Sequence, residues 1–292
     1  MADTRFDLHM HSVFSDGSFT VDELIDRARE NGLAGIAITD HDSLSQLSEV
    51  RQRARAHGFP VLAGLEASCW NPASGRKVHV LCYGLEATPA GDGPLERILA
   101  DTLRARTANT LWQAWTITRA NVDFKGRQIT VDDVIITAGR STGVYKQHVM
   151  QALTALPYLD PEYQRCYKHL FKNGGIAQYD ISYPDARDVV RAMREQGGHP
   201  VLAHPGQLDS WDIVPDLVKA GLEGIEAHHP DHDASDAAHA HELAEKFGLF
   251  VTGGSDFHGR YGAPKDVGCC GITTDEAGER VAELFEQERD LS

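Results

Sequence analysis

Histidine and acidic residues gather at a few places in this chain, in spacings that suit metal binding. The sequence of 292 residues contains 15 histidines. His9 and His11 flank one residue of a strand-like segment, so their side chains project from the same face. Asp16 follows in the next loop, and Asp256 and His258 repeat the alternate spacing later in the chain. Imidazole nitrogens combined with carboxylate oxygens suit Mn, Fe or Zn ions.

Further candidate ligands stand at or near the ends of other apolar runs. They are His41 after 35–38, Glu66 at the end of 61–66, His79 within 78–84, and His204 after 201–203. Nine imidazole and carboxylate groups exceed what one ion binds, so several ions that share a bridging carboxylate are expected, and Glu66 is placed to bridge. For any single histidine the alternative is a core or surface role without metal. We expect helix-surface positions for His57, His169, His239 and His241.

The elements that must position these residues are predicted as alternating strands and helices. Short apolar runs predict strands at 6–11, 35–38, 61–66, 78–84, 201–203, 224–227 and 250–254. Amphipathic segments between most of them predict helices, and this alternation is typical of parallel βα units. Seven strands favour a closed or nearly closed barrel over an open sheet. In such barrels the active residues lie at the carboxyl ends of the strands, which is where the candidate ligands fall.

The alternation stops between residues 91 and 196. A long helix is predicted over 95–122, with Trp112 and Trp115 on its buried face, and shorter helices follow around 131–137, 145–156, 161–173 and 184–196. We therefore expect a discontinuous barrel, formed by 1–90 and 197–292. Residues 91–196 are expected to form a helical insertion that recognises the substrate.

The composition restricts the possible functions. With 28 Lys and Arg against 43 Asp and Glu, the net charge is −15, which disfavours binding to long nucleic acids or anionic membranes. No apolar run approaches the roughly 20 residues that cross a bilayer. The first seven residues lack the profile of a signal peptide. The five cysteines have no CxxC spacing. A cytoplasmic enzyme with reduced cysteines is expected.

As a set, the motifs resemble those of the PHP (polymerase and histidinol phosphatase) family. They are His9-Met10-His11-Ser12, Ser15-Asp16-Gly17, Thr39-Asp40-His41, Gly64-Leu65-Glu66, Ala203-His204-Pro205 and Gly254-Ser255-Asp256-Phe257-His258, and the resemblance covers about 5–84 and 199–260. It implies an α/β fold, a distorted (β/α)7 barrel with a helical insertion, and three divalent ions. Mn²⁺ is the expected ion, with Fe, Mg or Zn as alternatives.

The resemblance also implies which residues hold each ion. One ion would be held by His9, His11, Glu66 and Asp256, a second by Glu66, His79 and His204, and a third by Asp16, His41 and His258. No ligand of the pattern is missing, which implies an active enzyme.

The length and the insertion make the chain similar to the bacterial 3′,5′-nucleoside bisphosphate phosphatases and the related 5′→3′ exoribonucleases of that family. The resemblance implies removal of the 3′-phosphate from nucleoside 3′,5′-bisphosphates, such as adenosine 3′,5′-bisphosphate, to give nucleoside 5′-monophosphates. A hydroxide that bridges the ions would attack phosphorus. Asp16, His41, His229 and His258 are expected to be catalytic, with His229 protonating or orienting the leaving group.

Substrate contacts are expected from the loop after the first strand, from the insertion and from the segment after 224–227. The candidates are Ser12, Arg104, Arg106, Arg140, Lys146, His148 and His229. Ser12 would donate to a phosphate oxygen, and arginine is suited to the second, non-reacting phosphate because its planar fork pairs with two phosphate oxygens.

Three other functions fit the same residues. The first is a 5′→3′ exoribonuclease that trims short RNA ends, the second a histidinol-phosphate phosphatase, and the third a non-catalytic metal-binding barrel. The acidic charge favours a small nucleotide over a long RNA, and the basic residues of the insertion disfavour a cationic amine. The expected partner is therefore a small nucleotide or a short RNA, and not a membrane.

Overall fold

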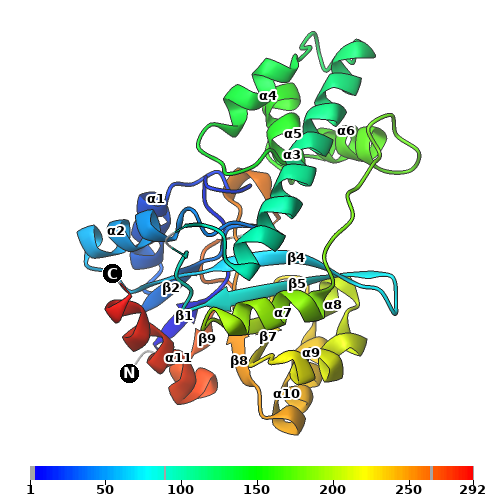
Figure 1. Cartoon of the computed structure of the whole chain (residues 1–292). Coiled ribbons are helices and arrows are strands. Elements are labelled where there is room, and N and C mark those ends of the chain that lie inside the picture. The colour runs from blue at the N-terminus through cyan, green and yellow to red at the C-terminus, as the bar shows by residue number, and fades with distance from the viewer. Residues whose placement is uncertain (1–3, 89, 264–265, 292) are drawn as a thin grey trace.

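Two β-sheets with covering helices form one part of the molecule, and a group of helices rises from it (Figure 1). The computed structural model describes residues 4–88, 90–263 and 266–291. Residues 1–3, on which the targeting prediction partly rests, lie outside the described residues. The strands are β1 (Arg5–Asp7), β2 (Gly35–Ile38), β3 (Val61–Ala63), β4 (Leu65–Asn71), β5 (Arg76–Tyr83), β6 (His199–Ala203), β7 (Gly224–His228), β8 (Phe250–Gly253) and β9 (Ile272–Thr273).

Helices account for most of the remaining structure. The α-helices are α1 (Val21–Glu30), α2 (Leu47–His57), α3 (Pro94–Arg119), α4 (Val131–Ala138), α5 (Lys146–Thr154), α6 (Pro161–Phe171), α7 (Ala186–Glu195), α8 (Pro205–Leu208), α9 (Val214–Ala220), α10 (Ala234–Phe247) and α11 (Thr274–Asp290). Short 3₁₀ turns cover Trp211–Ile213 and Gly259–Tyr261.

The strands form a sheet in the order β3-β2-β1-β9 and a second sheet in the order β4-β5-β6-β7-β8. Backbone hydrogen bonds connect the two sheets on both sides. Leu8 N–H donates to the Gly253 carbonyl at 3.0 Å, and Glu66 N–H donates to the Asp40 carbonyl at 3.2 Å. The chain is therefore a mixed α/β protein, as predicted.

The prediction of uniformly parallel strands was wrong for the middle of the chain. β4 runs antiparallel to β5, and β5 runs antiparallel to β6, whereas β6, β7 and β8 are parallel. The reason is the short connection over 72–75 between β4 and β5, because only antiparallel neighbours are joined by so tight a turn. The predicted strand at 61–66 is divided into β3 and β4 at Gly64.

Local sequence explains where the helices begin and end. Thr20 caps α1 in a capping box with Glu23, as the sequence predicts, and Gly58 ends α2 in a left-handed conformation. The four predicted stretches that follow the long helix of the insertion each contain a helix, α4 to α7.

The buried apolar side chains form two clusters. The larger cluster lies between the sheets and their helices, and the smaller one is formed by the distal half of α3 with α4, α5 and α6. The predicted insertion over 91–196 includes α7, but the buried side chains of α7 belong to the larger cluster. Trp112 and Trp115, expected on the buried face of the long helix, are 44% and 48% exposed.

Among the described residues, no helix is both long enough and apolar enough to cross a membrane.

Candidate metal centre

Imidazoles and carboxylates from both sheets meet at one place, where the strands end. The side chains form three overlapping groups, and within each group the ligand atoms lie within 4.8 Å of one another. The groups are His9, His11, Glu66 and Asp256; Glu66, His79 and His204; and His11, Asp16, His41 and His258. The nine residues predicted as metal ligands are thus brought together, although the widest gap between them in sequence exceeds one hundred residues.

Glu66 occupies the middle of this assembly. Its Oε2 lies 3.3 Å from His9 Nε2 and 3.1 Å from His11 Nε2. Its Oε1 lies 2.7 Å from His79 Nδ1 and 2.9 Å from His204 Nε2. One carboxylate therefore faces ligand atoms of two groups with its two oxygens, which is the geometry of a bridging ligand.

The donor atoms fit divalent cations better than they fit one another. Asp16 Oδ1 and His41 Nδ1 are buried without a hydrogen-bond partner, and the Nε2 atoms of His9 and His11 face each other at 3.3 Å. Buried polar atoms in such positions are costly unless something satisfies them. A set of nitrogen and carboxylate donors without cysteine suits Mn, Fe or Zn ions.

The pKa shifts also indicate that the cluster favours a positive charge. Burial alone would lower the pKa of His11, but hydrogen bonds with Asp256 and Glu66 outweigh it and raise that pKa to about 10. Burial would raise the pKa of Glu66, yet the surrounding imidazoles, His79 and His41 foremost, hold it well below its usual range. The carboxylates thus stay ionised and favour a cation beside them, whether a proton on His11 or a metal ion.

Tight backbone packing brings the last ligands into place. A Cβ atom at Gly254 would lie 2.3 Å from His9 Cβ, so only glycine lets this chain segment approach the residues after β1 so closely. Two residues later, Asp256 has φ 48°, and His204 has φ 26°. Left-handed backbone at non-glycine residues costs about 1–3 kcal/mol and is typical of functional sites.

Three buried carboxylates that are not among the predicted ligands or substrate contacts hold the ligand-bearing segments. Asp7 accepts the N–H groups of Ser255 at 2.9 Å and Gly268 at 2.6 Å. Asp40 accepts the hydroxyls of Ser12 and Ser15, each at 2.6 Å, which fixes the loop that carries Asp16.

Glu226 plays the same part for His9. Its two oxygens lie 3.1 and 3.3 Å from His9 Nδ1, and it accepts the His204 N–H at 2.8 Å. Its place at the end of the run 224–227 was the signal that could have identified it, since the other candidate acids also follow strands.

We expect Glu226→Gln to reduce phosphoesterase activity about 10- to 100-fold, because carboxylates that orient metal-bound imidazoles contribute effects of that size. Metal affinity should fall with it, and added metal should restore part of the rate. The measurement is the rate against metal concentration for both proteins. A variant whose loss is identical at every metal concentration would contradict an effect through His9.

A polar cavity of about 310 Å³ opens beside the ligand groups. Its wall includes Asp16, His41 and His79 from the cluster and three cationic side chains, Lys77, Arg106 and Lys146.

The three cations differ in how they are held. Arg106 donates to Asp42 and to Ser68, each at 2.7 Å, and Lys77 lies 2.5 Å from Asp180. Lys146 has no ion-pair partner within the part of the chain that the structure describes. Burial lowers the pKa of Lys146 to about 8, and the like charge of neighbouring Lys77 contributes to this shift. The cavity is therefore suited to an anion adjoining the candidate metal centre.

Four predicted substrate contacts do not reach this cavity. Ser12 is buried and donates to Asp40, and Arg104 is exposed and pairs with Asp101. These two side chains have local partners that hold them elsewhere.

The other two, like Arg104, belong to the predicted insertion. Arg140 pairs with Glu49 at 2.6 Å on the outer surface. His148 is buried, and its Nδ1 accepts the N–H of Tyr145 at 3.2 Å. His148 therefore completes the start of α5 rather than facing a ligand. Sequence alone could not separate these residues from Arg106 and Lys146, because that choice depends on which face of each helix meets the sheets.

His229 stands at the edge of the cluster. Its Nε2 lies 3.3 Å from Asp256 Oδ2, and its Nδ1 accepts the Asp231 N–H at 3.1 Å. It lines a cavity of about 220 Å³ together with Asp256 and His258. This position is compatible with the predicted contact to a leaving group.

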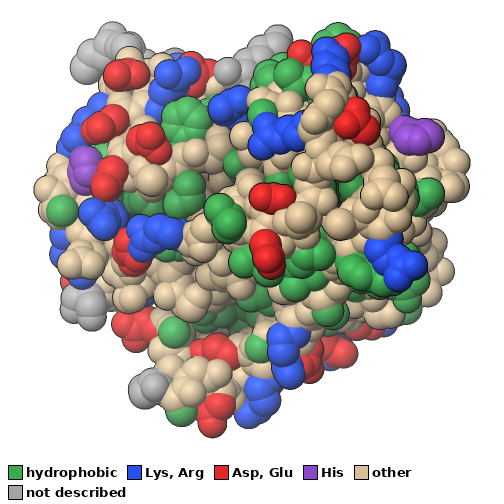
Figure 2. All heavy atoms as spheres, turned by 90° about the horizontal axis from the view of Figure 1, so that it is seen from above, with side chains coloured by type: hydrophobic (Ala, Val, Ile, Leu, Met, Phe, Trp, Pro, Cys, Tyr) green, Lys and Arg blue, Asp and Glu red, His purple; other side chains and the backbone are tan. Residues whose placement is uncertain are grey.

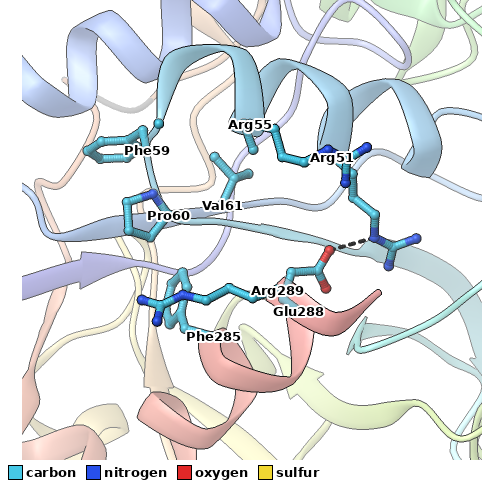
Figure 3. Close-up of a pocket in the computed structure, with 10 residues that line it drawn as sticks. Arg51, Arg55, Phe59, Pro60, Val61, Phe285, Glu288 and Arg289 are labelled. Carbon is cyan, nitrogen blue, oxygen red and sulfur yellow. Dashed lines mark hydrogen bonds and ion pairs between the residues drawn. The ribbon is translucent and has the colours of Figure 1, made fainter. Parts of the chain in front are cut away.

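Another pocket, of about 380 Å³, lies between α2 and α11 at the start of β3 (Figure 3). Pro60, Val61 and Phe285 line it, and Arg51 pairs there with Glu288 at 2.7 Å. It is at the opposite end of the strand from the ligand cluster and contains none of the candidate ligands. We therefore assign the chemistry to the cavity beside Glu66.

Comparisons with known proteins agree with this architecture. A model of the PHP domain matches residues 7–172. The chain is 45% identical to the phosphoribosyl 1,2-cyclic phosphate 1,2-diphosphodiesterase of Eggerthella lenta, over 90% of this chain and 97% of that protein. It is 28% identical to the 3′,5′-nucleoside bisphosphate phosphatase of Chromobacterium violaceum, over 90% of each.

Two solved structures also resemble this chain over nearly its whole length. A protein from Bifidobacterium adolescentis described as a metal-dependent phosphoesterase superimposes with a TM-score of 0.81 at 26% identity, covering 98% of this chain and 97% of that one. An amidohydrolase from Chromobacterium violaceum with bound sulfate and no metal gives a TM-score of 0.77 at 26% identity, covering 97% and 96%.

Proposed function

The chain belongs to the PHP domain family and is a metal-dependent phosphoesterase; we propose that it hydrolyses the cyclic phosphate diester of a small phosphorylated sugar, of the phosphoribosyl 1,2-cyclic phosphate type. The observation that carries the proposal is the cavity of about 310 Å³ that joins the ligand cluster to three cationic side chains. Its volume is at the lower end of the range for small-molecule sites. The identity of 45% to a full-length cyclic phosphate diesterase supports this substrate class.

Three divalent ions are proposed, with Mn²⁺ first and Fe, Mg or Zn as alternatives. The first ion would be held by His9, His11, Glu66 and Asp256, the second by Glu66, His79 and His204, and the third by Asp16, His41 and His258. When bound, such ions neutralise phosphate charge and lower the pKa of a bound water toward about 7.

The chain's own residues would supply orientation and a proton. In the proposed hydrolysis the water gives up one proton and its oxygen joins phosphorus, one phosphorus–oxygen bond to the sugar breaks, and the freed sugar oxygen takes up a proton. His229 is proposed to deliver that proton, because it lines the adjoining cavity of about 220 Å³ together with the candidate ligands Asp256 and His258, and its Nε2 lies 3.3 Å from Asp256. Arg106 and Lys146 would bind the non-reacting phosphate of the sugar, since both line the cavity beside His41.

Hydrolysis of nucleoside 3′,5′-bisphosphates is the second candidate. The relative of 28% identity supports it, and the same cations would pair with a second phosphate. The exposed Trp112 and Trp115 do not line the cavity, so a base would have to stack on tyrosine instead.

The exoribonuclease and histidinol-phosphate phosphatase activities have less support. Basic and acidic side chains are interspersed on the face seen in Figure 2, which offers that face no continuous basic track for an RNA strand. Lys77, Arg106 and Lys146 would repel the amine of histidinol phosphate.

A substrate comparison tests the proposal. We expect the highest kcat/KM with the 1,2-cyclic phosphate of ribose 5-phosphate, compared with adenosine 3′,5′-bisphosphate and a 5′-phosphorylated oligoribonucleotide, in metal-reconstituted protein. Product chromatography would measure the ring-opened phosphomonoester, which carries its phosphate still attached, and phosphate release would be measured in parallel for the bisphosphate. A preference for the bisphosphate would replace the proposal by the second candidate.

Lys146 gives a specific prediction for substrate binding. We expect Lys146→Met to raise KM about 10- to 100-fold with little change in kcat, since a charged hydrogen bond contributes about 1.5–3 kcal/mol. Arg140→Met is the matched control, because Arg140 pairs with Glu49 outside the cavity. An equal effect of both substitutions would exclude Lys146 from phosphate binding.

The same residue predicts a pH dependence. Because the pKa of Lys146 is lowered to about 8, the ammonium is present below that pH and is lost above it. KM should therefore rise as the pH increases through about 8, and Lys146→Arg should extend the low-KM range to higher pH. A profile that is the same in both proteins would contradict this assignment.

A further inference from the structure

A second cluster of metal-binding side chains lies outside the candidate centre. His228 at the end of β7, His241 on α10 and Glu276 in the first turn of α11 have ligand atoms within 4.8 Å of one another. His228 Nε2 is 2.5 Å and His241 Nε2 is 3.3 Å from the same oxygen, Glu276 Oε1. The three side chains are 30–41% exposed, so an ion could reach them from solvent.

A β-bulge explains why this cluster is separate from the centre. Residues two apart on a strand normally point to the same face, and Glu226 points inward to His9. The register shifts between Glu226 and His228, and a bulge of this kind re-aims the following side chain. His228 consequently points to Glu276 on α11 instead of joining the inner cluster.

We propose that His228, His241 and Glu276 form a separate binding site for a divalent transition-metal ion of the Zn²⁺ type. Two imidazoles and one carboxylate are a ligand set that Zn²⁺ takes, with a fourth position left for water. Ligands about 2.0–2.2 Å from a tetrahedral ion are spaced about 3.3 Å apart, which the pair of His241 and Glu276 already satisfies. The pair of His228 and Glu276 is shorter and must open slightly, which the partly exposed carboxylate of Glu276 allows.

The same short contacts occur where the family's metal centre is expected. Glu66 lies 2.7 Å from His79 and 2.9 Å from His204, so direct contacts between imidazole and carboxylate stand at both places where a cation would separate them.

An ion at this site would connect three elements that are distant in sequence. Glu276 precedes Gly278, whose φ of 68° and ψ of −172° interrupt α11. The first turn of α11 is therefore separated from the rest of the helix by this break. Thr273 caps that turn. Binding of an ion should therefore hold the start of α11 against β7 and α10, and its effect should be on stability rather than on turnover.

The test compares metal content and thermal stability in the full chain. Wild type, His241→Ala, Glu276→Gln and the control His239→Ala, which removes a neighbouring histidine of α10 that contacts Glu242, would be dialysed against micromolar free Zn²⁺ and analysed by mass spectrometry. We expect wild type and His239→Ala to hold one equivalent more than the other two variants. Added Zn²⁺ should raise the Tm of the first pair further, while the rate of phosphoester hydrolysis stays within about twofold in all four.

Three results would overturn the proposal. They are equal Zn²⁺ content in all four proteins, loss of turnover in Glu276→Gln that parallels its loss of metal, and a zinc anomalous map of crystals with no peak between these side chains. Circular dichroism in chelator separates misfolding from loss of the site, because properly folded variants should match wild type there. None of these results depends on which phosphoester is the substrate.

Discussion

Glu66→Gln should reduce phosphoester hydrolysis by on the order of 10³-fold or more, equal to about 4 kcal/mol of activation free energy. The side chain is buried, and its two oxygens face His9 and His11 on one side and His79 and His204 on the other. The amide keeps the size but removes the negative charge that two adjacent cations would share. The loss should exceed that of Glu226→Gln, which changes a group outside the proposed ligand set.

Two measurements accompany this prediction. Metal content after dialysis should fall by at least one equivalent, and the circular dichroism spectrum should be unchanged. Glu49→Gln is the matched control, because Glu49 forms its ion pairs with Arg53 and Arg140 on the surface. Full metal content and near-normal turnover in Glu66→Gln would remove Glu66 as a bridging ligand and with it the proposed arrangement of the ions.

Removal of metal by a chelator should abolish turnover and lower the Tm by several degrees. A ligand present at one hundred times its Kd stabilises a protein by about 2.7 kcal/mol, and the carboxylates of Glu66, Asp16 and Asp256 repel one another without cations. Activity and Tm should return together when Mn²⁺ is restored.

The difference in Tm between metal-loaded and metal-free protein should widen as the pH rises from about 7 to 9. In the metal-free protein the pKa of His11 is raised to about 10, so its bound proton stabilises the fold fully below the unfolded-state pKa of about 6.5 and is lost as the pH rises through about 10. Metal replaces that proton and removes this dependence. Differential scanning calorimetry of both forms measures it, and a difference that narrows with pH would contradict the proposed exchange of a proton for a metal ion.

The sequence by itself determined the identities of the clustered groups and their positions at strand ends. Local rules suffice for this, since apolar runs predict strands and alternate spacing puts His9 and His11 on one face. The capping box at Thr20 is local in the same way.

Only the tertiary structure decided which polar residues outside the cluster face the cavity. Arg106 and Arg104 are two residues apart on α3, yet one lines the cavity and the other pairs with Asp101 in solvent. Their roles depend on how α3 is rotated against the sheets, and no local pattern encodes that rotation. The antiparallel β4–β5 pair and the bulge after Glu226 likewise arise from strand pairing between distant segments. Short-range sequence patterns therefore predicted the candidate ligands, and long-range packing placed the polar residues that surround them.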